Sequence, residues 1–584
     1  MFDSQSIKEN IITNLKKTIE EEFGLVATED LTFELKTPPQ PKMGDLGWSC
    51  FTLGKKLKKK PEEIAKILAH KFKLNKTIEK IVNLGPYLNF FLNKEKWFSL
   101  VLNEILEKKE NFGSSKIGES KTVIIEFSAP NTNKPQHLGH LRNNFLGDSL
   151  ANLFNNLGYK VIKANLINDR GIHITKSMLA YQKWGQEKTP ETEKIKGDHF
   201  VGKFYTLFEE KVRENPYLLT EAQELLRKWE EGNQEVWQLW QKMNAWAMQG
   251  FYETYKKLGI EFDKWYYESE TYKLGKEIVL EALKKNFCYQ REDGAIEIDL
   301  SNYKLGKKVL IRADGTSVYI TQDLGLAKLK NDEYKPNLSI YVVGSEQEYH
   351  FNILFKVLEV FGFDWVKNCY HLSYGLVFLP AGRIKSRAGV AVEIDGLLEE
   401  VKKIAKGEIL KRDKEISPQE LEERAEKITL ASLRFFFLKF SPKEPITYNP
   451  EAEISFEGAT GPYLQYTYAR IQGIIKKSQI SNHKSRTSQA IDYSVLNRPE
   501  EIEILKLLFD FPEVLEKAAL SYNQSFLANY LLELAQIFNT FYHRHPVLSA
   551  PKKIRHARLI LIETVAQVLK NGLNLLGIEV LERM

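Results

Sequence analysis

Residues 121–169 read KTVIIEFSAPNTNKPQHLGHLRNNFLGDSLANLFNNLGYKVIKANLIND. The run TVIIEF is continuously apolar and β-branched, which is typical of a strand buried on both faces of a parallel sheet. A helix is expected from about His137 to Leu157, ending at Gly158, and KVIKANLIND indicates a second strand. Strand, helix and strand in this order predict a βαβ unit.

The pattern continues downstream as an interrupted parallel sheet. Residues 175–285 are expected to be mostly helical, and the spacing of their tryptophans indicates core packing rather than a ligand box. The tryptophans are Trp229, Trp237, Trp240 and Trp246. Four later runs, AIEIDL, SVYIT, SIYVVG and LSYGLVFL, predict the second half of a doubly wound sheet. We therefore expect an α/β core over 121–395 with a helical insertion at about 175–285.

The flanking regions have other compositions. Residues 1–112 combine an amphipathic helix, a Pro-rich turn, a lysine-dense helix and the apolar strand GPYLNFFL, which predicts an α+β unit. The segment NFGSSKIGES resembles a short Gly/Ser linker. Strand patterns disappear after about 396, so we expect a connecting helical segment over 396–459 and a helix bundle over 460–584. In the last helix, one apolar face is expected to be buried, formed by Leu559, Ile562, Val565, Ala566, Leu569, Leu573 and Leu576.

Composition excludes several classes of protein. The chain has 584 residues, with 83 Lys plus Arg against 77 Asp plus Glu, and a net charge of +6 excludes a histone-like binder. Its three cysteines, Cys50, Cys288 and Cys369, are far apart, so neither a disulfide framework nor a zinc site is expected. No apolar run is long enough for a membrane span, and the N-terminus lacks the features of a signal peptide. An intracellular protein that does not bind membranes is the expectation.

The motif His137-Leu138-Gly139-His140 follows the first buried strand and opens the next helix. Open parallel sheets bind ligands at this position, and a helix N-terminus attracts phosphate. Two imidazoles at i and i+3 can donate hydrogen bonds to phosphate oxygens, while Gly139 permits close approach to the backbone. The alternative is a pair of solvent-exposed histidines at a helix start. The sequence contains neither a P-loop nor a Gly-x-Gly-x-x-Gly motif.

Two further groups lie near predicted strand ends. The cationic loop RIKSRAG, which contains Lys385 and Arg387, can stabilise charge on departing pyrophosphate, although it can also be a solvated basic turn. A group of carboxylates and amides suits a small cationic substrate, because Asp and Glu match a guanidinium in bidentate fashion. These residues are Glu126, Asn131, Tyr319, Asp323 and Gln347. Each has a structural alternative: Tyr319 as a core residue, Asp323 as a helix cap and Glu126 as an ion-pair partner.

Several ordered motifs together resemble one family. They are SAPNTNKPQHLGHLRNNFLGDSLANLF, RADGTSVYITQDLGLA, YVVGSEQEYHFNILF, KSRAG, FEGATGPYLQYTYARI and the C-terminal LGIEVLERM. Over essentially the whole chain they resemble arginyl-tRNA synthetase, a class I aminoacyl-tRNA synthetase. The resemblance implies a Rossmann-like core that forms arginyl-adenylate from arginine and ATP, and then esterifies the 3′ adenosine of tRNA(Arg). It also implies Mg²⁺ with ATP, no zinc, a monomer and a cytoplasmic location.

The resemblance assigns residues to each substrate. For ATP and its transition-state phosphates it implies His137, Gly139, His140, Lys385, Ser386 and Arg387, and for arginine Glu126, Ser128, Asn131, Tyr319, Asp323 and Gln347. The second loop of the family usually reads Lys-Met-Ser-Lys-Ser, whereas here only Lys-Ser-Arg is recognisable and Ala388 replaces a cation. Lys134, just before the His-x-Gly-His motif, is therefore expected to supply the missing phosphate charge.

The terminal regions are expected to contact tRNA. Residues 1–112 resemble the N-terminal additional domain of the family, which contacts the tRNA elbow, and Lys55 and Lys58 are candidates to meet phosphates there. The last 125 residues resemble the family's anticodon-binding bundle. Candidates to contact unpaired bases are Tyr463, Tyr466, Arg470, Tyr542 and Met584, with core packing as the alternative for each tyrosine. Both terminal regions are basic, at +3 for 1–110 and +4 for 460–584.

Three other functions are alternatives for this sequence. A nucleotidylyltransferase that does not act on tRNA shares the His-x-Gly-His motif but does not need the flanking units. A non-catalytic RNA-binding paralogue would lose the site, whereas the histidines, Asn131, Tyr319 and Asp323 are present here. A class I synthetase for another amino acid is the nearest enzymatic rival, and the carboxylates argue against an apolar substrate.

Overall fold

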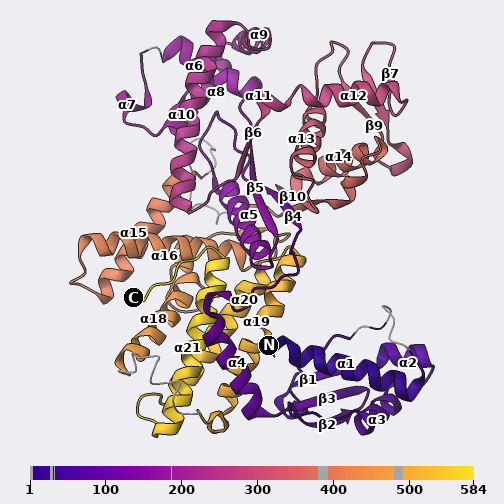
Figure 1. Cartoon of the computed structure of the whole chain (residues 1–584). Helices are drawn as coiled ribbons and strands as arrows, with labels where there is room; N and C mark the ends of the chain where they lie inside the picture. The colour runs from indigo at the N-terminus through magenta and orange to yellow at the C-terminus, as the bar shows by residue number, and fades with distance from the viewer. Residues whose placement is uncertain (1–3, 26–30, 32, 186, 379–391, 479–490) are drawn as a thin grey trace.

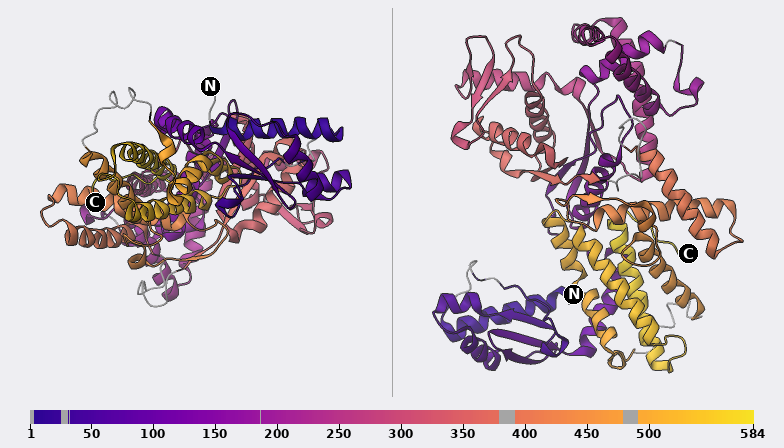
Figure 2. Two further views of the ribbon diagram at one scale, coloured as in Figure 1. Left: turned by 90° about the horizontal axis from the view of Figure 1, so that it is seen from below. Right: turned by 180° about the vertical axis from the view of Figure 1, so that it is seen from behind.

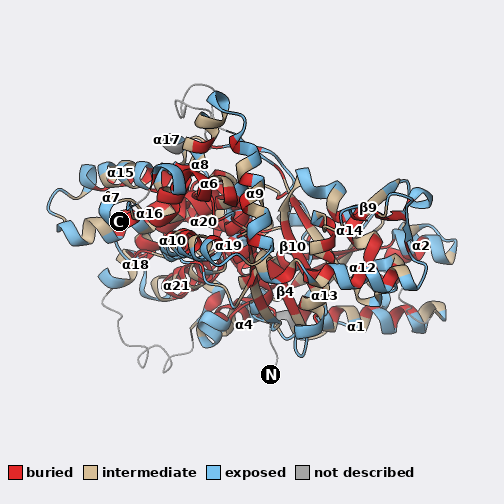
Figure 3. Cartoon of the chain, turned by 90° about the horizontal axis from the view of Figure 1, so that it is seen from above, coloured by how far each residue is buried: buried red, intermediate tan, exposed pale blue. Residues whose placement is uncertain are grey.

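The computed structural model describes residues 4–584 except 26–30, 32, 186, 379–391 and 479–490 (Figure 1). Three units are visible: an N-terminal α+β unit, a central α/β core with insertions, and a C-terminal helix bundle. Buried residues gather where the core and the bundle meet, and exposed residues lie on the outer faces (Figure 3). The predicted fold class is therefore confirmed.

The core is a five-stranded, all-parallel sheet in the order β11-β10-β4-β5-β6. Its strands are β4 (Thr122–Glu126), β5 (Lys160–Ile167), β6 (Lys264–Tyr267), β10 (Leu338–Gly344) and β11 (Cys369–Tyr374). The strand order reverses between β4 and β10, where Glu126 pairs with Tyr341 on one side and Ala164 on the other. Ligands bind at such a switch point, outside the carboxyl ends of the strands.

Two predicted strands differ from the structure. AIEIDL forms β8 (Ile296–Asp299) in a separate antiparallel sheet with β7 (Tyr289–Gln290) and β9 (Lys307–Ile311). SVYIT is not a strand, because α13 (Tyr319–Tyr334) begins inside it. Conversely, the edge strand β6 lies within the range expected to be a helical insertion. Short aromatic runs such as KWYY have no periodicity that separates a strand from a helix.

The insertions between core strands are largely helical. They comprise α6 (Ile172–Trp184), α7 (Pro190–Glu193), α8 (Gly197–Glu214), α9 (Leu218–Glu230), α10 (Gln234–Leu258), α11 (Glu268–Thr271) and α12 (Leu274–Lys284). After α13 and β10, α14 (Glu348–Val360) leads to β11. Trp229 is buried and stacks on Trp237, so the tryptophans pack together as expected, although Trp237 is partly exposed.

The N-terminal unit docks beside the bundle (Figure 2). It contains α1 (Ser4–Phe23), β1 (Leu46–Ser49), α2 (Phe51–Leu57), α3 (Pro61–Lys71), β2 (Ile78–Leu84), β3 (Tyr87–Leu92) and α4 (Lys94–Lys108). Helix α4 packs against α21 of the bundle. The expected linker is anchored there, because Phe112 is buried and stacks on Phe511 at 5.9 Å.

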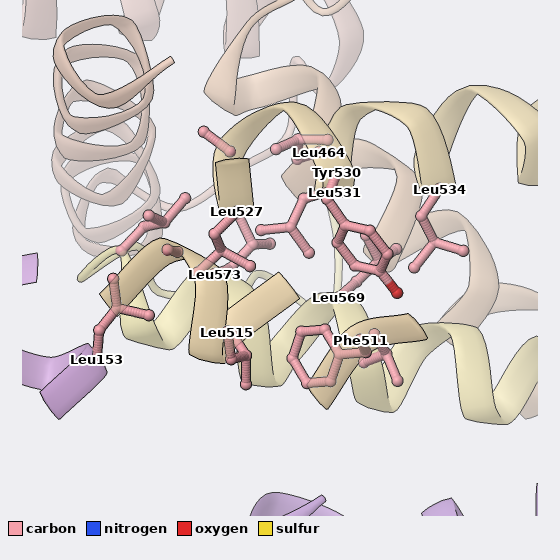
Figure 4. Packing of buried hydrophobic residues seen from close by; sticks show 14 of the residues in the cluster. Leu153, Leu464, Phe511, Leu515, Leu527, Tyr530, Leu531, Leu534, Leu569 and Leu573 are labelled. Carbon is pink, nitrogen blue, oxygen red and sulfur yellow. The ribbon is translucent and has the colours of Figure 1, made fainter. Parts of the chain in front are cut away.

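The C-terminal bundle shares its core with the α/β unit. Its elements are α15 (Ile394–Arg412), α16 (Pro418–Leu438), α17 (Pro450–Glu453), α18 (Gly461–Lys477), α19 (Pro499–Leu520), α20 (Ser525–Arg544) and α21 (Lys552–Leu575), with β13 (Ile446–Thr447) pairing with β12 (Val377–Phe378). The predicted apolar face of the last helix is buried. Leu153 of α5 (Leu138–Asn156) joins Leu527 and Leu573 in this core (Figure 4).

A buried ion pair fixes the core on the bundle. Arg434 of α16 and Asp148 of α5 are 2.9 Å apart, and both side chains are almost fully buried. The same guanidinium donates to the carbonyl oxygens of Leu258 and Leu576. A buried charge is tolerated only when it is hydrogen-bonded in this way, so the pair specifies one arrangement of the two units.

Candidate active site

The His-x-Gly-His motif forms the N-terminal cap of α5. The Nδ1 atom of His137 accepts from the amide of Gly139 at 3.2 Å, and the Nδ1 atom of His140 accepts from the amide of His137 at 3.2 Å. This reciprocal pair is a capping box made with imidazoles. Because each Nδ1 accepts, both neutral rings carry their proton on Nε2. Each histidine therefore keeps one N–H donor for a ligand.

Both histidines are neutral at physiological pH. Burial, together with the charge of Lys134, lowers the pKa of His137 to about 4. Burial also lowers the pKa of His140 well below its ordinary value, and the charges of His137 and Lys134 add to this effect. The ring centroids are only 4.1 Å apart, so two imidazolium cations would repel each other. The neutral pair can donate hydrogen bonds, and Lys134 is the cationic side chain whose charge acts on both rings.

Gly139 also has a structural effect beyond the close approach of a ligand that the sequence predicts. A Cβ atom at this position would lie 3.1 Å from Cε1 and 3.2 Å from Nδ1 of His137. Both distances are tighter than ordinary van der Waals contact, so the missing side chain makes room for the capping ring of His137. Close approach of a ligand to this backbone remains a prediction.

A strained turn follows β4. It opens the segment Ser128–His140, which ends in the first turn of α5 and is here called the HxGH loop. Ser128 and Ala129 both have positive φ, at 79° and 48°. Such backbone costs roughly 1–3 kcal/mol per residue and persists only where the surroundings hold it. Asn143 Oδ1 accepts from the Ser128 amide at 2.5 Å, and Asn165 Oδ1 accepts from the Ala129 amide at 3.1 Å. The hydroxyl of Tyr255 completes the network, 2.5 Å from the Ser128 hydroxyl.

A cavity of about 320 Å³ opens beside the carboxyl ends of the strands. It brings together three of the residues predicted for a cationic substrate, namely Tyr319, Asp323 and Gln347. Its other lining residues are Leu166, Asn168, Glu268, Thr271, Gln322, Leu326 and His350. Tyr319 is 72% exposed at the first residue of α13, so its core alternative is wrong and the ring is free to contact a ligand.

Glu268 and His350 were missed by the sequence analysis. Glu268 directly follows β6, so it would have been identified if KWYY had been recognised as a strand. Burial raises the pKa of Glu268 to about 7, although Arg170 opposes this shift. The side-chain amide of Gln322 bridges Glu268 and Arg170 when it is oriented to satisfy both. Its nitrogen then donates to Glu268 at 2.8 Å, and its oxygen accepts from Arg170 at 2.9 Å. His350 Nε2 lies 2.6 Å from Asp323 Oδ2, and this hydrogen bond raises the pKa of His350.

The other residues predicted for arginine lie outside this cavity lining. The carboxylate of Glu126 pairs with Lys330 at 2.7 Å, and both side chains are largely buried. The same ammonium lies 3.8 Å from the ring centroid of Tyr341. Ser128 is buried in the strained turn, whereas Asn131 is exposed and its backbone bridges to Asn168. Lys385, Ser386 and Arg387 lie outside the described residues.

Four of the five bundle residues predicted to contact RNA line one cavity of about 780 Å³. They are Tyr466, Arg470, Tyr542 and Met584. The guanidinium carbon of Arg470 lies 4.8 Å from the ring centroid of Tyr466 and 5.0 Å from that of Tyr542. Tyr463 does not line the cavity, and its hydroxyl accepts from Asn539 at 2.9 Å. In the N-terminal unit, Lys55 on α2 and Lys58, which ends this helix, are both exposed.

Two further searches cover the part of the chain that the structure describes. None of its helices has the length and apolar character needed to cross a membrane. One group, formed by Asp198, His199 and Asp395, meets the spacing of a metal site. The ammonium of Lys196 lies between its two carboxylates, 3.3 Å from Asp198 and 2.6 Å from Asp395. A cationic side chain therefore already neutralises this group.

Comparisons with known proteins identify the family. The model described as "tRNA synthetases class I (R), catalytic domain" matches residues 101–441. The "Arginyl tRNA synthetase N terminal domain" matches 5–92, and the "DALR anticodon binding domain" matches 464–584.

Individual proteins match over the full length. The chain is 44% identical to arginine–tRNA ligase of Treponema denticola, over 99% of this chain and 100% of that protein. It is 41% identical to the Parabacteroides distasonis enzyme, over 100% of both. The structure of Thermus thermophilus arginyl-tRNA synthetase superposes with a TM-score of 0.84 at 27% identity, covering 99% of this chain and 100% of that one. The chain therefore belongs to the arginyl-tRNA synthetase family of class I synthetases.

Proposed function

We propose that this chain ligates arginine to tRNA(Arg) in two steps, using ATP. The supporting observation is the cavity that places Asp323 and Glu268 at the sheet edge beside the HxGH loop. Two carboxylates at one edge favour a guanidinium, and helix-start donors favour phosphate. An apolar side chain would offer no hydrogen-bond donor to either carboxylate, whereas a guanidinium offers several.

The arginine side chain is proposed to enter this cavity. Asp323 and Glu268 accept from the guanidinium, Tyr319 covers it from the rim, and Gln347 contributes an amide. Ser128 and Asn131 remain the predicted contacts for the α-carbon end of arginine. Glu126 also remains a predicted contact, and its pairing with Lys330 means that it must exchange partners to reach the substrate.

The phosphates of ATP are proposed to lie against the start of α5. His137 and His140 donate from Nε2, and Lys134 adds a positive charge next to both rings. Lys385, Ser386 and Arg387, which lie outside the described residues, are the predicted second set of phosphate contacts. Mg²⁺ is expected to arrive bound to ATP, because this ion is usually held largely by substrate phosphates and water.

Activation then needs positioning and electrostatics rather than a protein nucleophile. A carboxylate oxygen of arginine attacks the α-phosphorus, and the bond from that phosphorus to the bridging oxygen of pyrophosphate breaks. Neutral donors and a fixed cation are already oriented before charge develops, so little reorganisation opposes the step. In the second step, a ribose hydroxyl of the terminal adenosine attacks the arginyl carbonyl, and AMP leaves.

Arginine-dependent exchange of pyrophosphate into ATP, measured with and without tRNA(Arg), tests this assignment. We expect exchange with arginine, and none with lysine or methionine in its place. The absence of arginine-dependent exchange both with and without tRNA(Arg) would contradict the assignment. The expectations of a cytoplasmic location and a monomer rest on the sequence alone and remain predictions.

The pH dependence of arginine binding provides a second test. Without substrate, Glu268 has a pKa of about 7, whereas a bound guanidinium favours its charged form. Arginine binding therefore releases a proton below pH 7, and the KM for arginine is expected to rise up to about tenfold per pH unit as the pH falls below 7. In Glu268→Gln the KM should be higher and nearly flat between pH 6 and 7. A parental KM that does not change over this range would contradict the role of Glu268.

The cavity in the bundle is proposed to bind unpaired anticodon bases. Arg470 holds Tyr466 and Tyr542 at its rim, and aromatic faces beside a guanidinium suit base stacking. The unit over 1–112, with Lys55 and Lys58, is proposed to contact the tRNA elbow.

Tyr542→Ala is expected to weaken tRNA(Arg) binding about 5- to 150-fold, because stacking on one base contributes about 1–3 kcal/mol. Tyr542→Phe keeps the ring and should bind within about threefold of the parent. Filter binding of labelled tRNA at fixed salt measures both. Equal affinity of the alanine and phenylalanine proteins would exclude stacking on this ring.

A further inference from the structure

Helix α8, in the first insertion, lies directly against the HxGH loop. Gly202 is the point of closest approach. A Cβ atom there would lie 2.8 Å from Cδ of Pro135 and 3.4 Å from the Cα of Lys134. Lys134 and Pro135 stand three and two residues before His137. The surface of α8 at Gly202 is therefore in contact with the backbone that carries the histidines.

A second connection runs through Val392–Ile394. The amide of Leu138 donates to the carbonyl of Val392 at 2.9 Å, and the amide of Ile394 donates to the carbonyl of Gln136 at 3.0 Å. Together they form an antiparallel bridge between His137 and Glu393. The backbone of His137 is thus paired with a segment that enters α15.

That segment is held by one turn of α8. His199 contacts Glu393 through Nδ1 at 3.2 Å and Asp395 through Nε2 at 3.0 Å. His199 and Gly202 are three residues apart, so they lie on the same face of the helix. Lys196, before α8, also binds Asp395 at 2.6 Å, and Lys257 of α10 binds it at 3.0 Å. Figure 1 shows the lower end of α10 meeting the start of α15.

The charges of this cluster favour one arrangement. Hydrogen bonds that His199 donates to Asp395 and Glu393 raise the pKa of His199 to about 9, against the effect of its burial. His199 is therefore protonated and donates to both acids at once. Burial would raise the pKa of Asp395, but bonds from His199, Lys196 and Lys257 hold it far below its usual range. Asp198, buried next to Lys196, completes the charged groups around the ring.

We propose that α8 positions the HxGH loop for catalysis, with Gly202 and His199 as positioning residues. Gly202 sets the distance between the helix and Pro135, and His199 holds the segment paired with His137. Neither residue touches substrate. This inference rests on the proposed function, because its consequence is the placement of the Nε2 donors of His137 and His140 against the phosphates.

Gly202→Ala and His199→Ala test the two contacts separately. Each is expected to lower kcat of arginine-dependent pyrophosphate exchange about 10- to 100-fold, since displacements of about 1 Å can cost 100-fold in rate. The KM for arginine should change much less than kcat, because the two contacts reach residues 134–138 and the cavity around Asp323 does not contact α8. Exchange is measured on the full chain with tRNA(Arg) present, together with the melting temperature.

Four further variants make the result specific. Glu393→Ala removes only the Nδ1 contact of His199 and leaves its contact with Asp395, so it should cost less than His199→Ala. The double variant should lose little more than His199→Ala alone, because that substitution already removes the contact with Glu393. His199→Arg keeps the charge and several donors and should restore much of the rate even if His199→Ala folds poorly. Lys203→Ala, a substitution on α8, removes an exposed ion pair with Glu193 of α7 and should leave exchange unchanged.

The possible outcomes separate the hypotheses. Unchanged kcat in folded Gly202→Ala and His199→Ala proteins would overturn the inference. An equal change in the KM for arginine would also overturn it, because a general structural defect would then explain the loss. If the parent protein shows no arginine-dependent exchange, the proposed function fails and the inference falls with it.

Discussion

Replacement of His140 by asparagine is expected to lower the kcat of arginine activation about 100- to 1,000-fold, the usual effect of removing one oriented donor from a transition state. The asparagine oxygen can replace Nδ1 and accept from the His137 amide, which His140 binds at 3.2 Å. No donor then remains at the position of Nε2. The protein should therefore fold normally but lose stabilisation of the phosphates.

His140→Gln provides the matched variant. Its amide nitrogen reaches the position of Nε2, so we expect it to keep more activity, with a loss below about tenfold in kcat. The glutamine has no acceptor at the position of Nδ1, however, so the helix loses a capping hydrogen bond. The free energy of unfolding of His140→Gln should therefore fall by about 1 kcal/mol. His70→Asn, at an exposed position on α3, should change neither property. A His140→Asn protein with the kcat of the parent would show that His140 acts only as a cap.

Asp323→Asn is expected to raise the KM for arginine about 30- to 150-fold, which corresponds to about 2–3 kcal/mol at the lower end of the range for one partner of a charge pair. The lower end applies because the Asp323 side chain is 32% exposed and solvent screens part of the interaction. The KM for ATP should change little, because the histidines are untouched. Steady-state exchange with each substrate varied in turn measures both constants.

A control for this variant is available on the same helix. Asp332 pairs with Lys328 on the exposed side of α13, so Asp332→Asn should leave both constants unchanged. The loss of Asp323 also removes the hydrogen bond that raises the pKa of His350. His350 should therefore titrate at lower pH in the variant, which NMR can follow. A KM for arginine that stays within about threefold of the parent would remove Asp323 from the guanidinium site.

Much of the fold followed from local patterns. TVIIEF and KVIKANLIND were identified as strands because a strand buried on both faces is continuously apolar. The helix at His137 was identified from its position after a strand and its end at Gly158. The strand β6 and the start of α13 inside SVYIT do not follow from such patterns, because four or five residues do not distinguish helical from strand periodicity.

Contacts between distant residues could not be predicted in the same way. Residues Tyr319, Asp323 and Gln347 were chosen as a site from their strand-end positions, and the cavity brings them together. Glu126 was grouped with them, but its carboxylate faces Lys330, which is 204 residues away in sequence. Nothing in the sequence around either residue indicates this ion pair, because it depends on how α13 packs against the sheet.

The sequence by itself determined the family, the parallel core and the helix that begins at the two histidines. These depend on residue order and on periodicity over a few turns, which act within one segment of chain. Only the tertiary structure decided that the histidines are neutral, that Glu268 completes the cavity and that α8 contacts the HxGH loop. Burial, pKa values and close contacts depend on atoms from remote segments, so they exist only after the chain has packed.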